Sequence, residues 1–157
     1  MNLEEKTIEK NTLFSGRIIN LRKDTALLPN GATATREVVE HPGGVCVAAL
    51  DEDDNLLMVK QFRYPYMEII LEVPAGKRDK SGEDPLECGK RELKEETGAV
   101  AEHYMSLGQL YPSPGYCDEI IHLFAAKGLS FGQCCPDDDE FLAVERVPLK
   151  TAVQMVL

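Results

Sequence analysis

The chain has 157 residues, of which 43% are hydrophobic and 28% charged, and a net charge of −10; this is the composition of one soluble globular domain of ordinary size. The negative charge argues against non-specific nucleic-acid binding, and no apolar run approaches the roughly 18 residues of a membrane span. Five cysteines without a CxxC pair indicate neither a zinc site nor a disulfide framework, so we expect a reducing cytoplasm, with Cys46 and Cys88 as small core residues.

The first 41 residues are predicted to form β-structure. Pro29-Asn30-Gly31 is a strong hairpin signal, because Asn-Gly suits a type I′ turn. The segment is poor in large apolar residues for its length, so it is expected to complete its burial against another part of the protein or a second subunit. We therefore divide the chain into an N-terminal β-region (1–41) and a second domain (42–157).

The second domain is predicted to begin with strands. Two apolar runs, Val45–Leu50 and Leu56–Val59, flank the polar turn Asp51–Asn55 and indicate another hairpin. The unbroken apolar character of the first run suits a central strand buried on both faces. Further strands are expected at 67–76, before the Pro/Gly-rich loop at 112–115, at 119–129 and at 141–149, and a last helix near Lys150.

The strongest local signal is a helix between Asp84 and Gly98. Asp84 followed by Pro85 indicates an N-cap and a first helical residue, and Gly98 the residue just past the C-terminus. Helical spacing places three small or apolar residues on one face, namely Leu86, Gly89 and Leu93. Many strands with one strong central helix and one at the end predict an α+β or α/β fold, with helices packed on a mixed sheet.

Three glutamates crowd the end of this helix. Glu92 and Glu96 are one turn apart beside the buried stripe, and Glu95 lies further out. Such like charges cost roughly 0.2–0.5 kcal/mol in water, but they become favourable around a divalent cation such as Mg²⁺, which prefers oxygen ligands. The alternative is a merely solvated helix face. Arg91 and Glu83 are spaced to form a charge-assisted pair that holds the preceding loop.

The pattern Glu83-x7-Arg91-Glu92-Leu93-x-Glu95-Glu96-x-Gly98, preceded by Gly76, resembles the Nudix box of the Nudix hydrolases. These enzymes hydrolyse nucleoside diphosphates linked to another moiety. The loop after Gly76 is one residue longer than usual, in a place where an insertion costs little. The resemblance implies a Nudix α/β/α sandwich with a mixed sheet and an N-terminal antiparallel β-sheet domain. It also implies Mg²⁺, or Mn²⁺ in its place, and structural roles for Gly76, Glu83, Arg91 and Gly98.

Within that family, residues 12–157 are most similar to the ADP-ribose pyrophosphatases. The similarity lies in Glu72–Gly76, Gln61–Tyr64, Ser113–Tyr116 and Asp137–Phe141. It implies four metal ligands: Glu92, Glu95, Glu96 and the carbonyl of Ala75. It implies substrate contacts by Arg36, Glu37, Arg63, Pro114, Gly115 and Glu119. The attacking water would be activated by Glu140, with Asp138, Asp139 and Glu95 as alternatives.

The implied reaction is hydrolysis of ADP-ribose to AMP and ribose 5-phosphate. The implied assembly is a cytoplasmic homodimer that exchanges its N-terminal β-domain, with a small-molecule nucleoside diphosphate sugar as the partner and neither nucleic acid nor membrane. Two alternatives remain open: hydrolysis of another nucleoside diphosphate sugar, because the box recognises only diphosphate and metal, and a non-catalytic ADP-ribose sensor. The intact glutamates argue against the sensor. Without the resemblance, Arg63 could be a surface arginine, and the loops at 113–116 and 137–140 simple turns.

Overall fold

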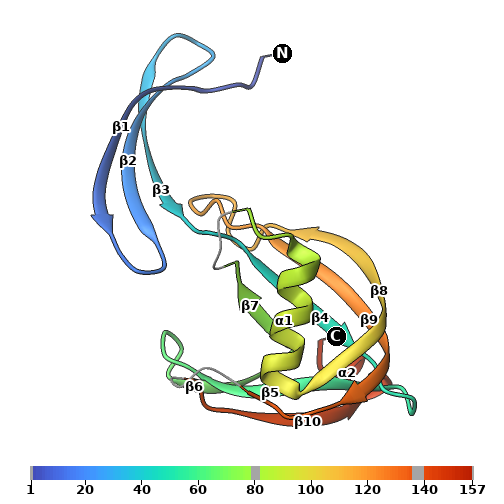
Figure 1. The fold of residues 1–157 in the computed structure, drawn as a ribbon. Coiled ribbons are helices and arrows are strands. Elements are labelled where there is room, and N and C mark those ends of the chain that lie inside the picture. Colours follow the sequence, from blue (N-terminus) through green and yellow to red (C-terminus); the bar gives the residue numbers. More distant parts are fainter. Residues whose placement is uncertain (1, 79–81, 136–139, 157) are drawn as a thin grey trace. The chain divides into compact units, whose positions relative to one another are not determined.

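The computed structural model describes residues 2–78, 82–135 and 140–156. The chain divides into two compact units, one of Met1–Gly43 with Tyr111–Ile120 and one of Gly44–Leu110 with Ile121–Leu157. Neither helix of the described part is long and apolar enough to cross a membrane. In chain order the elements are β1 (Lys6–Ser15), β2 (Asn20–Leu27), β3 (Thr33–Glu40), β4 (Gly44–Ala49), β5 (Asn55–Arg63), β6 (Glu68–Glu72), β7 (Ala75–Lys77), α1 (Pro85–Thr97), β8 (Ala99–Leu110), β9 (Ile121–Phe131), β10 (Leu142–Pro148) and α2 (Leu149–Val156) (Figure 1).

The first unit is built on an antiparallel sheet in the order β1-β2-β3. The hairpin predicted at Pro29–Gly31 is confirmed, since it joins β2 to β3. The type I′ turn is wrong: only Gly31 has a positive φ, 84°, and the loop closes through Leu28 N to Ala32 O at 2.8 Å. A two-residue Asn-Gly turn would place Pro29 at a ladder position, where it has no N–H to donate.

Strand β1 leaves apolar side chains uncovered. All ten of its residues are exposed, including Ile8, Leu13 and Phe14. The segment 111–120 belongs to the same unit: Val39 N donates to Tyr116 O at 2.7 Å, and Asp118 N to Val39 O at 3.1 Å. This unit therefore gathers two separate stretches of the chain without burying its first strand.

The second unit contains two sheets and both helices. One sheet has the order β10-β5-β6 and the other the mixed order β7-β4-β9-β8, in which only β4 and β9 pair in parallel. Leu57 of β5 lies in the core that includes Leu93 of α1, whereas Leu56 packs with Ala152 of α2. Neighbouring residues of a strand point to opposite faces, so β5 has a helix on each side. Figure 1 shows α1 beside β7 and β4.

The hairpin predicted around Asp51–Asn55 is only partly right. The turn is present, with Asp51 N donating to Asn55 O at 3.0 Å, but a single bridge, Leu50 to Leu56, joins its arms before β5 enters the other sheet. Both edges of β4 are already taken, by β7 and β9. The central strand is confirmed, but its burial on both faces only in part: Val45, Val47 and Ala49 on one face are at most 1% exposed, whereas Cys46 and Ala48 on the other face are half-buried.

Two smaller predictions, one on the strand at 67–76 and one on the cysteines, are only partly right. The strand expected at 67–76 is divided at Pro74 into β6 and β7, which lie in different sheets, because proline cannot donate to a ladder. Cys88 is fully buried as predicted, but Cys46 is only half-buried. It points to the face of β4 opposite Val45 and Val47.

Helix α1 begins and ends where the sequence predicted. Asp84 Oδ1 accepts hydrogen bonds from the backbone N–H groups of Leu86 and Glu87, at 2.9 and 3.2 Å, which satisfies donors that a helix start leaves unpaired. Gly98 ends the helix at a φ of 71° and donates to Lys94 O. These two caps fix the register of the glutamates between them.

Replacing Gly98 with alanine is expected to cost about 2–3 kcal/mol, because a left-handed φ disfavours a side chain and the new Cβ would also meet a backbone oxygen. That atom is Gly132 O, at 2.7 Å. Gly108→Ala is the matched control: its φ is 101°, and no described atom lies within 4 Å of a Cβ there. Urea unfolding should show a midpoint loss about twice as large for Gly98→Ala; equal losses would refute the steric contribution.

Candidate active site

Two buried carboxylates of α1 lie against the strand that precedes the helix. Glu92 and Glu96 are only 7% and 3% exposed. Ala75 N of β7 donates to Glu96 Oε2 at 3.1 Å. A Cβ at Gly76 would collide with the Glu92 carboxyl group, so the absence of a side chain at Gly76 makes room for that carboxylate. Pro74 with the start of β7 and one face of α1 thus form two walls of one site.

The protonation of this pair is strongly displaced. Burial raises the pKa of Glu92 to about 7, although Arg91 opposes the shift. Burial raises the pKa of Glu96 to about 8, against the lowering effect of the Ala75 N–H, and the charges of Glu92 and Glu140 raise it further. Two carboxylates one turn apart therefore lack enough positive charge when both are ionised, as expected of a site that receives a cation.

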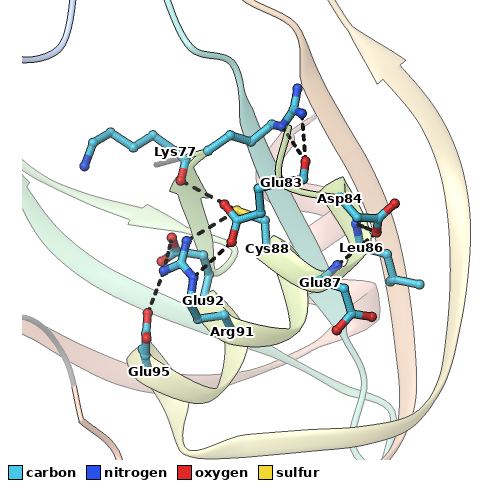
Figure 2. A network of polar contacts seen from close by, with 10 residues as sticks. Lys77, Glu83, Asp84, Leu86, Glu87, Cys88, Arg91, Glu92 and Glu95 are labelled. Atoms are coloured by element: carbon cyan, nitrogen blue, oxygen red, sulfur yellow. Dashed lines mark hydrogen bonds and ion pairs between the residues drawn. The ribbon is translucent and has the colours of Figure 1, made fainter. Parts of the chain in front are cut away.

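Arg91 pairs with three carboxylates of the motif, those of Glu83, Glu92 and Glu95 (Figure 2). Its Nη1 lies 2.9 Å from Glu92 Oε1 and 2.8 Å from Glu95 Oε2. The pairing predicted with Glu83 is present but long, 3.5 Å from Nε to Oε1. Arg78 also donates from Nη2 to the Glu83 carbonyl at 2.7 Å. Arg91 thus holds the loop before α1 as expected, and Glu95 faces this arginine while Glu96 faces Ala75.

The donor set fits a divalent cation. Among residues 2–78, 82–135 and 140–156, no three Asp, Glu, His or Cys side chains converge as a ready metal cage. Mg²⁺ does not need such a cage, since it is usually held by one or two carboxylates, waters and substrate phosphates. Glu92 and Glu96 supply buried, hard oxygen donors for this purpose, and the backbone of Ala75 adjoins them.

A substitution at Gly76 should lower activity while leaving the stability of the fold nearly unchanged. In Gly76→Ala the flexible carboxyl end of Glu92 would have to move, so we expect stability within about 1 kcal/mol of the original and activity roughly 10- to 100-fold lower. Gly132→Ala is the control, because its Cβ would have only an ordinary contact at 3.9 Å. Thermal unfolding and turnover are measured together. Unchanged turnover in Gly76→Ala would contradict this account of Gly76.

Arg63 and Glu140 belong to the same unit as the glutamate pair. Arg63, at the end of β5, donates from Nε and Nη2 to the two carboxylate oxygens of Glu72, at 2.7 and 2.8 Å. This pairing raises the pKa of Arg63, to which the charges of Glu96 and Glu140 also contribute. Glu140 is a half-buried residue, and its charge acts on both Glu92 and Glu96. Asp138 and Asp139 lie outside the described residues.

The other predicted substrate contacts belong to the first unit. Arg36 of β3 forms a two-bond pair with Glu5, at 2.9 Å from Nε and 2.6 Å from Nη2. Glu119 lies 3.3 Å from His41 Nδ1. Three further predicted residues are exposed, on β3 or in the loop that follows β8: Glu37, Pro114 and Gly115.

Sequence reasoning missed the carboxylates that hold the two arginines. The register places Arg63 opposite Glu68, so strand pairing would have indicated the wrong partner instead of Glu72. Glu5 stands 31 positions before Arg36, and no local spacing connects them. The only signal available was the position of Glu72 within the stretch Glu72–Gly76, for which the sequence alone assigned no contact.

Residues 40–156 match the family described as NUDIX domain, and the chain belongs to the Nudix hydrolases, as its motif predicted. Residues 5–39 match the family described as nucleoside diphosphate sugar hydrolase N-terminal domain.

Two relatives and one solved structure show how far the similarity extends. An ADP-ribose pyrophosphatase of Bacillus subtilis is 45% identical over 99% of this chain and 84% of its own length. A methanol dehydrogenase activator of Bacillus methanolicus is 46% identical over 98% of this chain and 83% of its own. A crystal structure titled ADP compounds hydrolase superposes with a TM-score of 0.85 over 99% of this chain and 85% of that one, at 23% identity. It confirms the predicted mixed α+β fold with an N-terminal antiparallel sheet. The family also implies a divalent metal ion.

Proposed function

We propose that the protein hydrolyses the diphosphate of ADP-ribose to AMP and ribose 5-phosphate, with Mg²⁺ as its metal and Mn²⁺ as a substitute. The observation that carries the proposal is the buried pair Glu92 and Glu96 beside Ala75, which suits a metal that binds a diphosphate. The choice of ADP-ribose as substrate rests on the Bacillus subtilis relative, which is similar over nearly the whole chain.

Glu92, Glu96 and the Ala75 carbonyl would hold the metal, with Glu95 as a further ligand. When bound, a divalent ion neutralises diphosphate charge and lowers the pKa of a coordinated water. The protein's own part is to supply anionic oxygens on a rigid helix. Arg91 contributes by engaging Glu95 and Glu92, which fixes their positions relative to Glu96.

Arg63 positions the diphosphate, since a guanidinium fork matches a pair of phosphate oxygens. One carboxylate then takes the proton of the attacking water. Glu140 is the first choice, because it is close enough to influence the pKa values of both Glu92 and Glu96; Asp138, Asp139 and Glu95 are the alternatives. The water oxygen bonds to one phosphorus, the bridging P–O bond breaks, and the leaving phosphate keeps the bridging oxygen.

A homodimer completes this proposal. The exposed strand β1, with Ile8, Leu13 and Phe14, is an apolar surface that a second copy of the chain would cover. Arg36, Glu37, Pro114, Gly115 and Glu119 are proposed to contact the substrate in that assembly. The cytoplasm is the proposed compartment.

The runner-up is hydrolysis of another nucleoside diphosphate sugar, favoured by the match of residues 5–39 to the N-terminal domain described for that substrate class. Release of AMP or GMP from ADP-ribose, ADP-glucose and GDP-mannose, with and without Mg²⁺, separates the candidates. We expect ADP-ribose to be preferred and turnover to require the metal. Preference for another sugar would support the runner-up, and binding of ADP-ribose without turnover would support a sensor.

A further inference from the structure

We propose that Glu72 is a positioning residue, which holds Arg63 side-on so that its Nη1–Nη2 edge faces the diphosphate. This inference rests on the proposed function, because it assigns Glu72 a part in binding the same substrate. Glu72 is neither a motif glutamate nor one of the metal ligands named above.

The geometry of the pair is specific. Arg63 uses Nε for Glu72 Oε1 and Nη2 for Glu72 Oε2, at 2.7 and 2.8 Å, so the carboxylate occupies the side edge of the guanidinium plane. One hydrogen of Nη1 and one of Nη2 remain on the end edge, and the second Nη1 hydrogen points back toward Cδ. Within the described part of the chain, the Arg63 guanidinium donates no other hydrogen bond. The end edge is the second fork that an arginine offers to paired oxygens.

Glu72 connects Arg63 to the backbone segment that lies against the proposed metal ligands. Glu72 ends β6, and three residues later the Ala75 N–H binds Glu96. Glu72 and Ala75 are thus carried by the same short segment. The Arg63 side chain must lean along the ladder to reach Glu72, since the register places it opposite Glu68. The pair therefore selects one direction for the arginine among those its flexible side chain could adopt.

The consequence is preorganisation. An unrestrained arginine loses rotamer freedom when it binds a ligand, and a residue that restrains it beforehand reduces that loss. Glu72 also offsets part of the positive charge of Arg63, so removal of Glu72 does not act by weakening electrostatic attraction. Loss of Glu72 should therefore raise KM more than it changes kcat.

The test compares Glu72→Gln, Arg63→Ala and the double variant in steady-state turnover of ADP-ribose with Mg²⁺. We expect Glu72→Gln to raise KM about tenfold with kcat within about twofold, the loss of one charge-assisted hydrogen bond. Added to Arg63→Ala, Glu72→Gln should cause no further loss, because Glu72 acts through Arg63. Glu145→Gln is the matched control: Glu145 pairs with Lys60 Nζ at 2.5 Å in the same sheet.

Failure of the positioning role and failure of the proposed function give different results. A Glu72→Gln variant that behaves like Glu145→Gln, or that multiplies the loss in Arg63→Ala, overturns the positioning role while ADP-ribose turnover stands. A wild-type protein that does not turn over ADP-ribose overturns the proposed function. In that case ADP-ribose binding by calorimetry takes the place of KM, with the same expected pattern. If Glu72→Gln fails to fold, Glu72→Asp keeps the charge but shortens the reach, and an unchanged KM there also overturns the inference.

Discussion

In Glu96→Gln, turnover should fall about 100- to 1000-fold, the order of the several kcal/mol that a correctly held metal ion contributes, while the metal-free protein should become more stable. Glutamine keeps the shape of the side chain and an oxygen for the Ala75 N–H, so the hydrogen bond at 3.1 Å can persist. It removes a charge that is buried at 3% exposure. The substitution therefore removes a metal ligand and relieves an unfavourable burial.

The two effects are measured on the same preparation. Calorimetric melting at pH 8 without metal should show a rise in melting temperature of roughly 5 °C, as expected for about 2 kcal/mol in a chain of this size. Glu87→Gln is the control on the same helix: its side chain is 63% exposed and pairs only with Lys90 among its described neighbours. Near-normal turnover in Glu96→Gln would refute the ligand role, and a lower melting temperature would refute the relief of charge burial.

The features that sequence predicted well depend on local chemistry. Helix α1 has the predicted ends because Asp84, Pro85 and Gly98 act on the backbone beside them, whatever the rest of the chain does. The central position of β4 in its sheet followed in the same way from its unbroken apolar run. The motif glutamates then fell on known faces of a helix with known ends, which is why their positions on α1 could be anticipated.

The features that sequence missed depend on which edges and partners are free in three dimensions. The strands on either side of Asp51–Asn55 separate because both edges of β4 are occupied. Pro74 diverts the chain between two sheets, which a continuous pattern of apolar residues does not reveal. Arg63 pairs with Glu72 although Glu68 is its partner in the register. The direction in which a side chain leans along a strand ladder is set by packing in the folded protein, so the strand register alone does not predict it.

A further large effect is expected on the pH dependence of stability in the metal-free protein. The pKa values of Glu92 and Glu96, about 7 and about 8, stand above the ordinary value of 4.5. Between 4.5 and 8 the folded protein therefore binds more protons than the unfolded chain, and its free energy of unfolding falls as pH rises. The contribution of this pair is fully present below pH 4.5 and is lost as pH passes through 7 and 8. This is the reverse of a salt-bridged carboxylate, whose stabilisation is lost on acidification.

We expect the melting temperature to drop by about 10 °C between pH 5 and pH 9, equivalent to on the order of 3 kcal/mol. The double variant Glu92→Gln with Glu96→Gln should flatten most of that slope, and the difference between the two curves isolates the pair from histidines and other titrating groups. Saturating Mg²⁺ should flatten the wild-type curve as well, because a cation favours the ionised carboxylates, and its apparent affinity should rise with pH over the same range. An equally steep curve in the double variant would place the pH dependence elsewhere in the protein. The opposite sign, with stability rising from pH 5 to pH 9, would mean that Glu92 and Glu96 already have sufficient positive charge around them, and the argument for a cation between them would fail.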